Sequence, residues 1–190
     1  MLDVEAIMVA TEEVLRRHGS SKATVVDVAK VLGVSHAAVY RYFPSKAALR
    51  EAVTRRWLGR VFDELAVADD STLAPPERLR GWLVALYRAK RRSAVGEPEL
   101  FETYRVIAEE SPAATGEHVV ALLRQLEGIV VAGVESGDFD ADDPAVTARV
   151  VFEATQSFHH PAHVGEWGLP DRDELLDGVC ALVVNGLRAR

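Results

Sequence analysis

The sequence has almost no cysteine and no long hydrophobic run, and both absences exclude whole classes of protein. The single cysteine, Cys180, cannot form a disulfide within the chain, so a disulfide-stapled secreted fold is excluded. No segment approaches the ~18 consecutive apolar residues that a membrane span needs. The acidic start of the chain, with Asp3 and Glu5, lacks the basic charge of a secretory signal. We therefore expect a cytoplasmic protein that does not associate with membranes.

Motifs of catalysis are also missing. The sequence contains no HExxH, no GxSxG, no glycine-rich phosphate loop and no CxxC. Cys180 lies among Val179, Leu182 and Val183, as a buried or interface residue would. We therefore expect neither an enzyme nor a cofactor.

What the chain does have is an ordinary globular composition with an uneven distribution of charge. Of its 190 residues 48% are hydrophobic and 27% are charged, which is typical of a folded protein. The net charge of −7 by itself disfavours nucleic acid as a partner. However, residues 1–60 carry ten Lys and Arg against six Asp and Glu, whereas residues 61–190 carry twelve against twenty-three. This asymmetry predicts a small basic module, able to approach a polyanion, joined to a larger acidic one.

Apolar residues recur at helical spacing along the chain, and we predict an all-α fold of about nine helices. The organisation is an N-terminal three-helix domain over residues 1–46, extended by the start of a connecting helix over 45–67, and a larger helical domain over 47–190. A loop is expected from Asp69 to Pro76. The expected helices are roughly 3–18, a two-turn helix from Thr24 to Gly33, a short helix from Ser35 to before Pro44, 45–67, one through Leu79 and Tyr87, 98–110, 113–136, 144–160 and 171–189.

Two short helices joined by a tight turn are predicted between Thr24 and Pro44. Thr24 and Ser35 are N-caps, and Gly33 tolerates the left-handed conformation that ends the first of the two helices. Val34 can pack on Val39 as a hydrophobic staple. Together these signals indicate a helix-turn-helix. A plain three-helix subdomain with core aromatics is the alternative, and the local positive charge favours DNA binding.

The outward side of the second short helix has the residues that reading a major groove requires. His36 can reach a base edge from the helix N-terminus, Ala37 can lie against a thymine methyl, and Arg41 can pair with guanine or phosphate. Hydroxyl and amine groups near the same face suit backbone phosphates. The DNA-binding candidates are Thr24, Ser35, His36, Ala37, Tyr40, Arg41, Tyr42 and Lys46.

The first sixty residues resemble tetracycline-repressor-type (TetR family) regulators. The resemblance covers about residues 3–60 and is densest over 24–49, T-V-V-D-V-A-K-V-L-G-V-S-H-A-A-V-Y-R-Y-F-P-S-K-A-A-L. It implies a homodimer with two-fold symmetry, double-stranded DNA with a palindromic operator as partner, and a helical C-terminal domain that binds a small-molecule ligand and dimerises. It also implies that Thr24, His36, Ala37, Tyr40, Tyr42 and Lys46 occupy DNA-contacting positions. We therefore expect a transcriptional regulator, most simply a repressor that an unidentified effector releases from DNA.

Ligand-binding residues in the larger domain are harder to predict. A helical domain of this size can hold a drug-sized cavity, usually lined by aromatic and a few polar side chains. On the helix over 144–160, Phe152, Thr155, Gln156 and His159 share one face, which turns from apolar to polar. Ordinary core packing is the alternative for each aromatic. The candidates are Trp82, Phe101, Tyr104, Phe152, Gln156 and His159.

Histidines near residue 160 raise the alternative of a metal-responsive regulator. His159 and His163 would share a helix face, but Pro161 lies between them and is expected to end the helix. Histidines that bond the last carbonyls of a helix explain the segment without a metal. A DNA binder without any effector is a further alternative.

Reading a palindrome requires two recognition helices, and therefore a dimer surface. Two helices carry more apolar residues than one internal face needs, although full burial within the monomer is the competing explanation. The candidate interface residues are Leu122, Leu123, Leu126, Ile129 and Val130 on one helix, and Leu175, Leu176, Val179, Leu182 and Val183 on the other.

Overall fold

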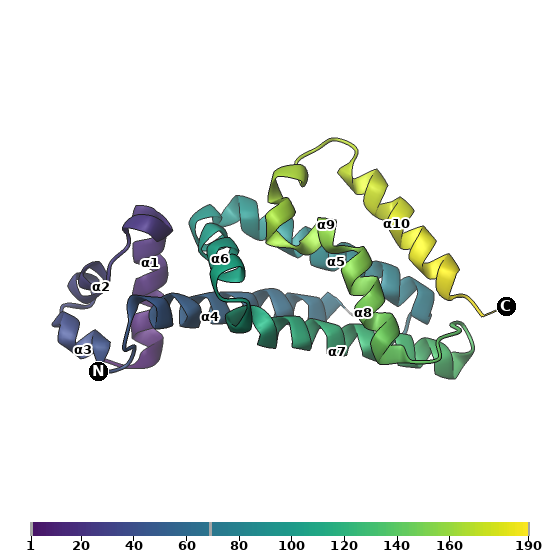
Figure 1. Cartoon of the computed structure of the whole chain (residues 1–190), viewed down its shortest axis with the longest axis horizontal. Coiled ribbons are helices and arrows are strands. Elements are labelled where there is room, and N and C mark those ends of the chain that lie inside the picture. Colours follow the sequence, from purple (N-terminus) through teal and green to yellow (C-terminus); the bar gives the residue numbers. More distant parts are fainter. Residues whose placement is uncertain (1, 69, 190) are drawn as a thin grey trace. The chain divides into compact units, whose positions relative to one another are not determined.

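The computed structural model describes residues 2–68 and 70–189 of the chain, and this part is 81% helical (Figure 1). Asp69, where the sequence predicts a loop to begin, lies outside the described residues. Within them the backbone forms no named strand, and the isolated bridge between Phe139 and Arg188 is the one β-type pairing. None of the helices in this part is long and apolar enough to cross a bilayer. The all-α prediction is confirmed.

Eleven helices make up the described part of the chain, of which eight are long. They are α1 (Val4–Lys22), α2 (Val25–Leu32), α3 (His36–Tyr40), α4 (Lys46–Ala68), α5 (Pro75–Gly96), α6 (Pro98–Glu110), α7 (Pro112–Ser136), α8 (Pro144–Ala154), α9 (Gln156–His159), the 3-10 helix η1 (Pro161–Glu166) and α10 (Arg172–Leu187).

Local side-chain chemistry explains most of these boundaries. The Asp3 carboxylate accepts a hydrogen bond from the Ala6 N–H at 2.8 Å and so caps α1. The helix expected over 144–160 is interrupted at Thr155, which separates α8 from α9. The Thr155 hydroxyl donates to the carbonyl of Val151 at 2.9 Å, and such back-bonding bends helices. One long helix was therefore predicted where the chain forms two.

The chain divides into two compact units, which are not simple halves of the sequence. Unit 1 consists of Met1–Arg60 and Ser93–Gly116, and unit 2 consists of Val61–Arg92 and Glu117–Arg190. Unit 1 therefore contains α6 as well as the N-terminal helices, and α6 packs against α1. Helix α4 begins in unit 1 and ends in unit 2.

The core of unit 1 is built around Trp57 of α4. The Trp57 ring lies 6.0 Å from Phe101 and 5.7 Å from Tyr104 of α6, measured between ring centroids. Burial raises the pKa of Tyr104 above its usual range. Phe101 and Tyr104, which the sequence analysis names as ligand candidates, thus lie in the core of unit 1.

Unit 2 has a separate core, to which α5, α7 and α10 contribute. Leu79, Leu83 and Leu86 of α5 are buried, as are Leu176 and Cys180 of α10. Four of the five interface candidates on α7 are also buried in this core, so internal packing accounts for their apolar character. They are Leu122, Leu126, Ile129 and Val130.

Candidate nucleic-acid interface and effector site

The two short helices of unit 1 are capped as the sequence predicts. The Thr24 hydroxyl accepts from the Asp27 N–H at 3.2 Å and donates to the Asp27 carboxylate at 2.6 Å. The latter hydrogen bond lowers the pKa of Asp27. Gly33 ends α2 at φ +66°, and the Ser35 hydroxyl accepts from the Ala38 N–H at 3.3 Å to start α3. The predicted helix-turn-helix is therefore present, with each turn position occupied by a residue suited to it.

Helix α3 is held by one side and exposed on the other. Val39 is completely buried, whereas His36, Ala37 and Arg41 are exposed. Tyr40 is 42% exposed, and the rings of His36 and Tyr40 meet edge-on with their centroids 6.3 Å apart. The helix ends at Tyr40, earlier than expected, because the chain turns tightly before Pro44. The side chains proposed to read DNA thus lie together on one solvent-facing surface.

Residues proposed to contact phosphate surround this surface, and two of them also make contacts within the protein. The Tyr42 hydroxyl donates to the carbonyl of Leu2 at 2.8 Å and ties down the start of the chain. The Lys46 ammonium, at the start of α4, lies 3.5 Å from the carbonyl of Ser21. Thr24 and Ser35 are exposed helix caps. Backbone N–H groups at such helix starts are suited to phosphate.

A buried carboxylate that sequence reasoning missed connects α1 to α4. Glu12 is only 5% exposed and accepts hydrogen bonds from Arg56 at 2.6 Å, Arg60 at 2.9 Å and Arg16 at 3.1 Å. The i, i+4 spacing of Glu12 and Arg16, and of Arg56 and Arg60, was visible in the sequence. What it could not show is that the two pairs meet.

Glu97, directly before α6, extends this charge network. It accepts from the Arg16 guanidinium and from the Trp57 indole N–H, both at 2.7 Å. Burial raises the pKa of Glu97, but these hydrogen bonds and the nearby Arg60 outweigh that effect and leave the pKa below its usual value. Helix α1 is therefore joined by charged hydrogen bonds to α4 and to the start of α6.

The predicted ligand residues of unit 2 fall in different surroundings. The Phe152 ring stacks on His159 with centroids 4.3 Å apart, and the His159 Nε2 lies 3.1 Å from the Phe152 carbonyl. Trp82 is buried and its indole donates to Gln125 at 3.0 Å. Gln156 points instead to the exposed Glu153. Of the four candidates in unit 2, Phe152 and His159 are thus the pair in direct contact.

A buried lysine near these residues was not foreseen. Lys90 of α5 is 1% exposed, and its ammonium nitrogen lies 3.2 Å from the Nε2 of His118 on α7. Burial lowers the pKa of Lys90 to about 7. Burial, helped by Lys90 and His159, lowers the pKa of His118 to about 2, and burial lowers that of His159 to about 3. Strongly shifted groups of this kind often mark functional sites. The sequence did contain a sign that Lys90 is buried, because Lys90 falls on the same helix face as the apolar residues Leu83, Leu86 and Tyr87.

The histidines near residue 160 are engaged separately. His159 contacts the carbonyl of Phe152 in the last turn of α8, whereas the Nδ1 of His163 lies 3.0 Å from the Glu166 carboxylate. Pro161 begins η1 between them. Across residues 2–68 and 70–189, no three potential ligand side chains converge as a metal site would require.

A capped helix pair with one face exposed defines a helix-turn-helix DNA-binding regulator. Comparison with protein families agrees: residues 7–53 match the bacterial regulatory proteins of the tetR family, and residues 75–180 match the tetracyclin repressor-like C-terminal domain. The chain belongs to the TetR family, whose members are non-enzymatic DNA-binding regulators.

Known relatives share part of their length with this chain. The HTH-type transcriptional regulator BetI of Rhizobium meliloti (strain 1021) is 29% identical over 136 residues, which cover 70% of this chain and 64% of BetI. The nucleoid occlusion factor SlmA of Vibrio cholerae serotype O1 is 40% identical over 68 residues, 32% of this chain and 35% of SlmA. In both cases the match spans less than two thirds of the relative.

Solved structures share the fold over nearly the whole chain. FadR from Bacillus subtilis, in complex with stearoyl-CoA, has a TM-score of 0.71 at 19% identity and covers 98% of this chain and 100% of its own. RolR in complex with resorcinol has a TM-score of 0.69 at 16% identity, covering 98% and 87%. A protein of unknown function from Rhodococcus sp. RHA1 reaches 0.72 at 22% identity, covering 97% and 94%. At these identities the likeness concerns the fold.

Proposed function

We propose that this protein is a homodimeric transcriptional repressor that binds a palindromic operator and leaves it when a small molecule binds in unit 2. The observation that carries the proposal is α3, which buries Val39 and exposes His36, Ala37 and Tyr40 side by side. Bound to chromosomal DNA, such a regulator acts in the cytoplasm. His36 and Ala37 read base edges, Arg41 reads guanine or phosphate, and the remaining candidates hold the backbone. The backbone contacts are Thr24, Ser35, Tyr40, Tyr42 and Lys46.

The test of DNA reading starts from selection of genomic fragments by the purified protein, followed by fluorescence anisotropy on the selected operator. Tyr40→Phe removes a phosphate contact, so affinity should fall about 3–10-fold for all sequences alike. His36→Ala should instead change the preferred base, with a loss of about 1–3 kcal/mol of discrimination at one position in each half-site.

The matched control is His18→Ala, because His18 is an exposed histidine on α1 outside the proposed reading surface. Its operator affinity and base preference should equal those of the wild type. An unaltered base preference in His36→Ala would remove His36 from the reading surface, and failure to select any palindrome would contradict the proposal as a whole.

The dimer surface is best supported on α10 and α8 of unit 2. Leu182 is 75% exposed, and Leu175 on the same helix is also exposed, while Leu176, Cys180 and Val184 bury the opposite side. On α8, Val146 and Val150 are exposed four residues apart. Exposed apolar residues at helical spacing, on helices already packed by their other face, are typical of intersubunit bundles.

Leu182→Glu should weaken the dimer, because it places a charge in an apolar contact. Sedimentation velocity should show a shift toward monomer, and operator affinity should fall because two half-sites are no longer read together. Val95→Glu is the control, since Val95 is equally exposed at 78% but lies on α5 at the start of the second segment of unit 1. A Leu182→Glu protein that remains dimeric would place the interface elsewhere.

Effector binding in unit 2 is supported by its buried polar groups and by the neighbours of the fold. FadR and RolR were crystallised with stearoyl-CoA and resorcinol, respectively. In this chain the buried Lys90 and His159 and the half-buried His118 supply nitrogens among apolar side chains, a usual composition for a ligand site. Helix α4, which runs from unit 1 into unit 2, is the element that transmits the effect.

Candidate effectors are the substrates of the enzymes that are encoded beside the selected operator, and each is tested for its effect on operator affinity. A true effector should reduce operator affinity by about 5–150-fold, which corresponds to ~1–3 kcal/mol of coupling. His118→Asn should weaken the response to the effector and leave operator affinity without effector unchanged. A full response in His118→Asn would exclude this part of unit 2 from the effector site.

A further inference from the structure

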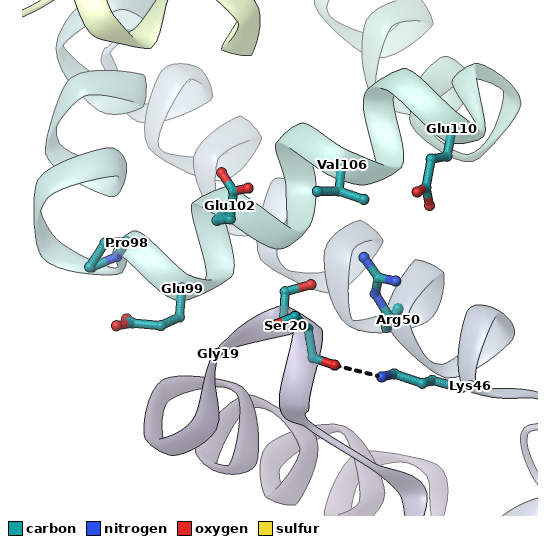
Figure 2. Close-up of a pocket in the computed structure, with 10 residues that line it drawn as sticks. Gly19, Ser20, Lys46, Arg50, Pro98, Glu99, Glu102, Val106 and Glu110 are labelled. Atoms are coloured by element: carbon teal, nitrogen blue, oxygen red, sulfur yellow. Dashed lines mark hydrogen bonds between the residues drawn. The ribbon is translucent and has the colours of Figure 1, made fainter.

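A cleft of about 560 Å³ lies within unit 1, among the end of α1, the first turns of α4 and one side of α6 (Figure 2). This volume falls in the range of small-molecule sites. The cleft exists because Gly19, at φ +73°, redirects α1 before its last residues, so that Ser20 faces α4 and α6. It is formed by unit 1 alone and is separate from the proposed effector site.

The two walls of the cleft carry opposite charge. On α4, Lys46 and Arg50 are four residues apart and share a face. On α6, Glu99, Val106 and Glu110 fall at spacings that also share a face, and all three line the cleft. Glu99 lies at the opposite end of the cleft from Lys46 in Figure 2. A molecule in the cleft therefore contacts a basic wall on α4 and an acidic wall on α6. Val106, between Glu99 and Glu110 on α6, gives it an apolar contact.

Three of the charged side chains on these walls, Arg50, Glu99 and Glu110, are not paired within the part of the chain that the structure describes. The Nε of Arg50 is buried without a hydrogen-bond partner among the residues that the structure describes. In the same residues Arg50, Glu99 and Glu110 make no ion pair, whereas Glu102 on α6 is paired with Arg105 at 2.7 Å. A buried polar group left without a partner is unfavourable, and an unfilled binding site is one reason for such a group to persist.

We propose that this cleft binds a small amphoteric molecule, whose acid group pairs with Arg50 and whose amine pairs with Glu99. A purely anionic ligand would meet the carboxylates of Glu99 and Glu110, and a purely cationic one would meet Lys46 and Arg50. Each like-charge encounter is repulsive, and the repulsion is stronger beside a protein surface than in bulk water. A molecule with one charge of each sign, held apart by a short chain, satisfies both walls.

The individual contacts follow from the chemistry of the side chains. The guanidinium of Arg50 can offer its Nε–H together with a second N–H to one carboxylate, which is a strong bidentate geometry. The hydroxyl of Ser20, which lies beside Arg50 in Figure 2, is a further donor. Val106 covers the methylene chain between the charged ends.

Binding here has a regulatory consequence. The cleft is lined by α1, α4 and α6, which are also the elements that Glu12 and Glu97 connect. Lys46 both lines the cleft and is a proposed phosphate contact, so an occupant competes for a group that DNA uses. The cleft thus provides a second input into operator binding, independent of any effector in unit 2.

The test uses the full-length protein and a series of ω-amino acids from 3-aminopropanoate to 8-aminooctanoate. Matched alkanoates and alkylamines of the same length lack one of the two charges. Binding is followed by the ¹H–¹⁵N resonance of the Arg50 Nε–H, assigned by its absence in Arg50→Gln. One chain length should bind at least about tenfold more tightly than either monofunctional compound, and should shift the Arg50 resonance.

Variants separate the two ends of the ligand. Glu99→Gln should remove the preference for the amine, so that the alkanoate then binds as well as the amino acid. Glu109→Gln is the matched control, because Glu109 neighbours Glu110 on α6 but is paired with Arg105 at 2.7 Å, and its binding should be unchanged. Arg50→Gln should abolish binding while operator affinity without ligand stays at the wild-type level.

Three results would overturn the proposal: no saturable shift of the Arg50 resonance at any chain length, equal affinity for the monofunctional compounds, or wild-type selectivity in Glu99→Gln. Because the wild-type resonance is itself a readout, a variant that fails to fold does not prevent a decision. Operator binding is measured separately, so its failure is distinguishable from failure of the cleft.

Discussion

The buried Glu12 of unit 1 and the Lys90–His118 pair of unit 2 handle the cost of burial in opposite ways. In unit 1 the carboxylate of Glu12 is buried but bonded to three arginines that are themselves partly exposed. In unit 2 Lys90 and His118 meet in the interior, and burial drives both toward their neutral forms. Charge pairs join α1 to α4 and to the start of α6 in unit 1. The Lys90–His118 contact in unit 2 is not an ion pair, so the proposed effector would not have to break one there.

The largest effect is expected from removing the centre of the unit 1 network. Glu12→Ala removes the buried carboxylate that three guanidinium groups share, and leaves them only Glu5 and Glu97 as partners. We expect a loss of about 2–4 kcal/mol in the free energy of unfolding, less than for a fully buried pair because the arginines reach solvent. Hydrogen exchange should show the loss in α1 and α4 and not in α10.

Glu13→Ala is the control for this variant, because Glu13 is the neighbouring residue and makes a more exposed pair with Arg17. It should cost no more than ~1 kcal/mol. Equal effects of the two substitutions would mean that the Glu12 network contributes no more than an ordinary surface pair.

The next effect is a pH dependence specific to unit 2. The folded pKa values of His118 and His159 are about 2 and about 3, below the 6.5 of the unfolded chain. At pH values between the folded and unfolded pKa, the unfolded state binds protons that the native state does not. The free energy of unfolding therefore has its full value above pH 6.5 and decreases as the pH falls below it. The slope approaches 1.4 kcal/mol per pH unit for each histidine.

Hydrogen exchange at pH 6.5 and 5.5, corrected for the intrinsic exchange rate, should show this loss in α7 and α8. The double variant His118→Asn, His159→Asn should be nearly insensitive over the same interval. If the loss of protection against hydrogen exchange were confined to α1–α3, the pH dependence would belong to unit 1 and not to unit 2.

A smaller effect is expected above neutral pH. Burial places the folded pKa of Lys90 at about 7 against 10.5 in the unfolded chain, so the unfolded state binds the extra proton between these values. Stability should therefore rise from pH 7 toward pH 9, by at most ~1.4 kcal/mol per pH unit. Lys90→Met should lose this rise in urea denaturation at the two pH values, and a slope equal to wild type would mean that Lys90 is charged in the fold.

The smallest effect is expected for an exposed pair in unit 2. Arg80 and Asp177 are 2.8 Å apart and both are 57% exposed. Arg80→Ala should cost no more than ~1 kcal/mol, and the difference should vanish in 1 M NaCl because salt screens exposed charges. A cost that persists in 1 M NaCl would mean that Arg80 contributes through packing of its aliphatic stem and not through the ion pair.

Sequence reasoning succeeded where the signal is local. The caps at Thr24 and Ser35, the left-handed Gly33 and the start of α6 at Pro98 could each be read from a few neighbouring residues. It failed at Thr155, because a threonine hydroxyl in a helical pattern does not reveal whether it bonds back to the preceding turn. The DNA-contacting roles of the exposed α3 residues stay predictions.

Sequence reasoning did not find the residues whose role depends on partners far away in the chain. Glu12 and Arg60 are 48 residues apart, and the opposing walls of the cleft come from segments at least as far apart in the chain. Lys90 carried a usable signal, since it occupies an apolar position of α5, but its pairing with His118 depends on how α5 packs on α7. Likewise, the apolar residues of α7 became core and those of α10 stayed partly exposed, which their similar patterns did not distinguish.

The sequence by itself determined the all-helical class, the helix-turn-helix and the basic character of the N-terminal segment, because caps, glycine geometry and periodicity act within a turn or two of helix. Only the tertiary structure decided which charges are paired, which titratable groups are buried, and where an open cleft is left. Those properties depend on desolvation and on contacts between segments that the chain brings together only when it folds.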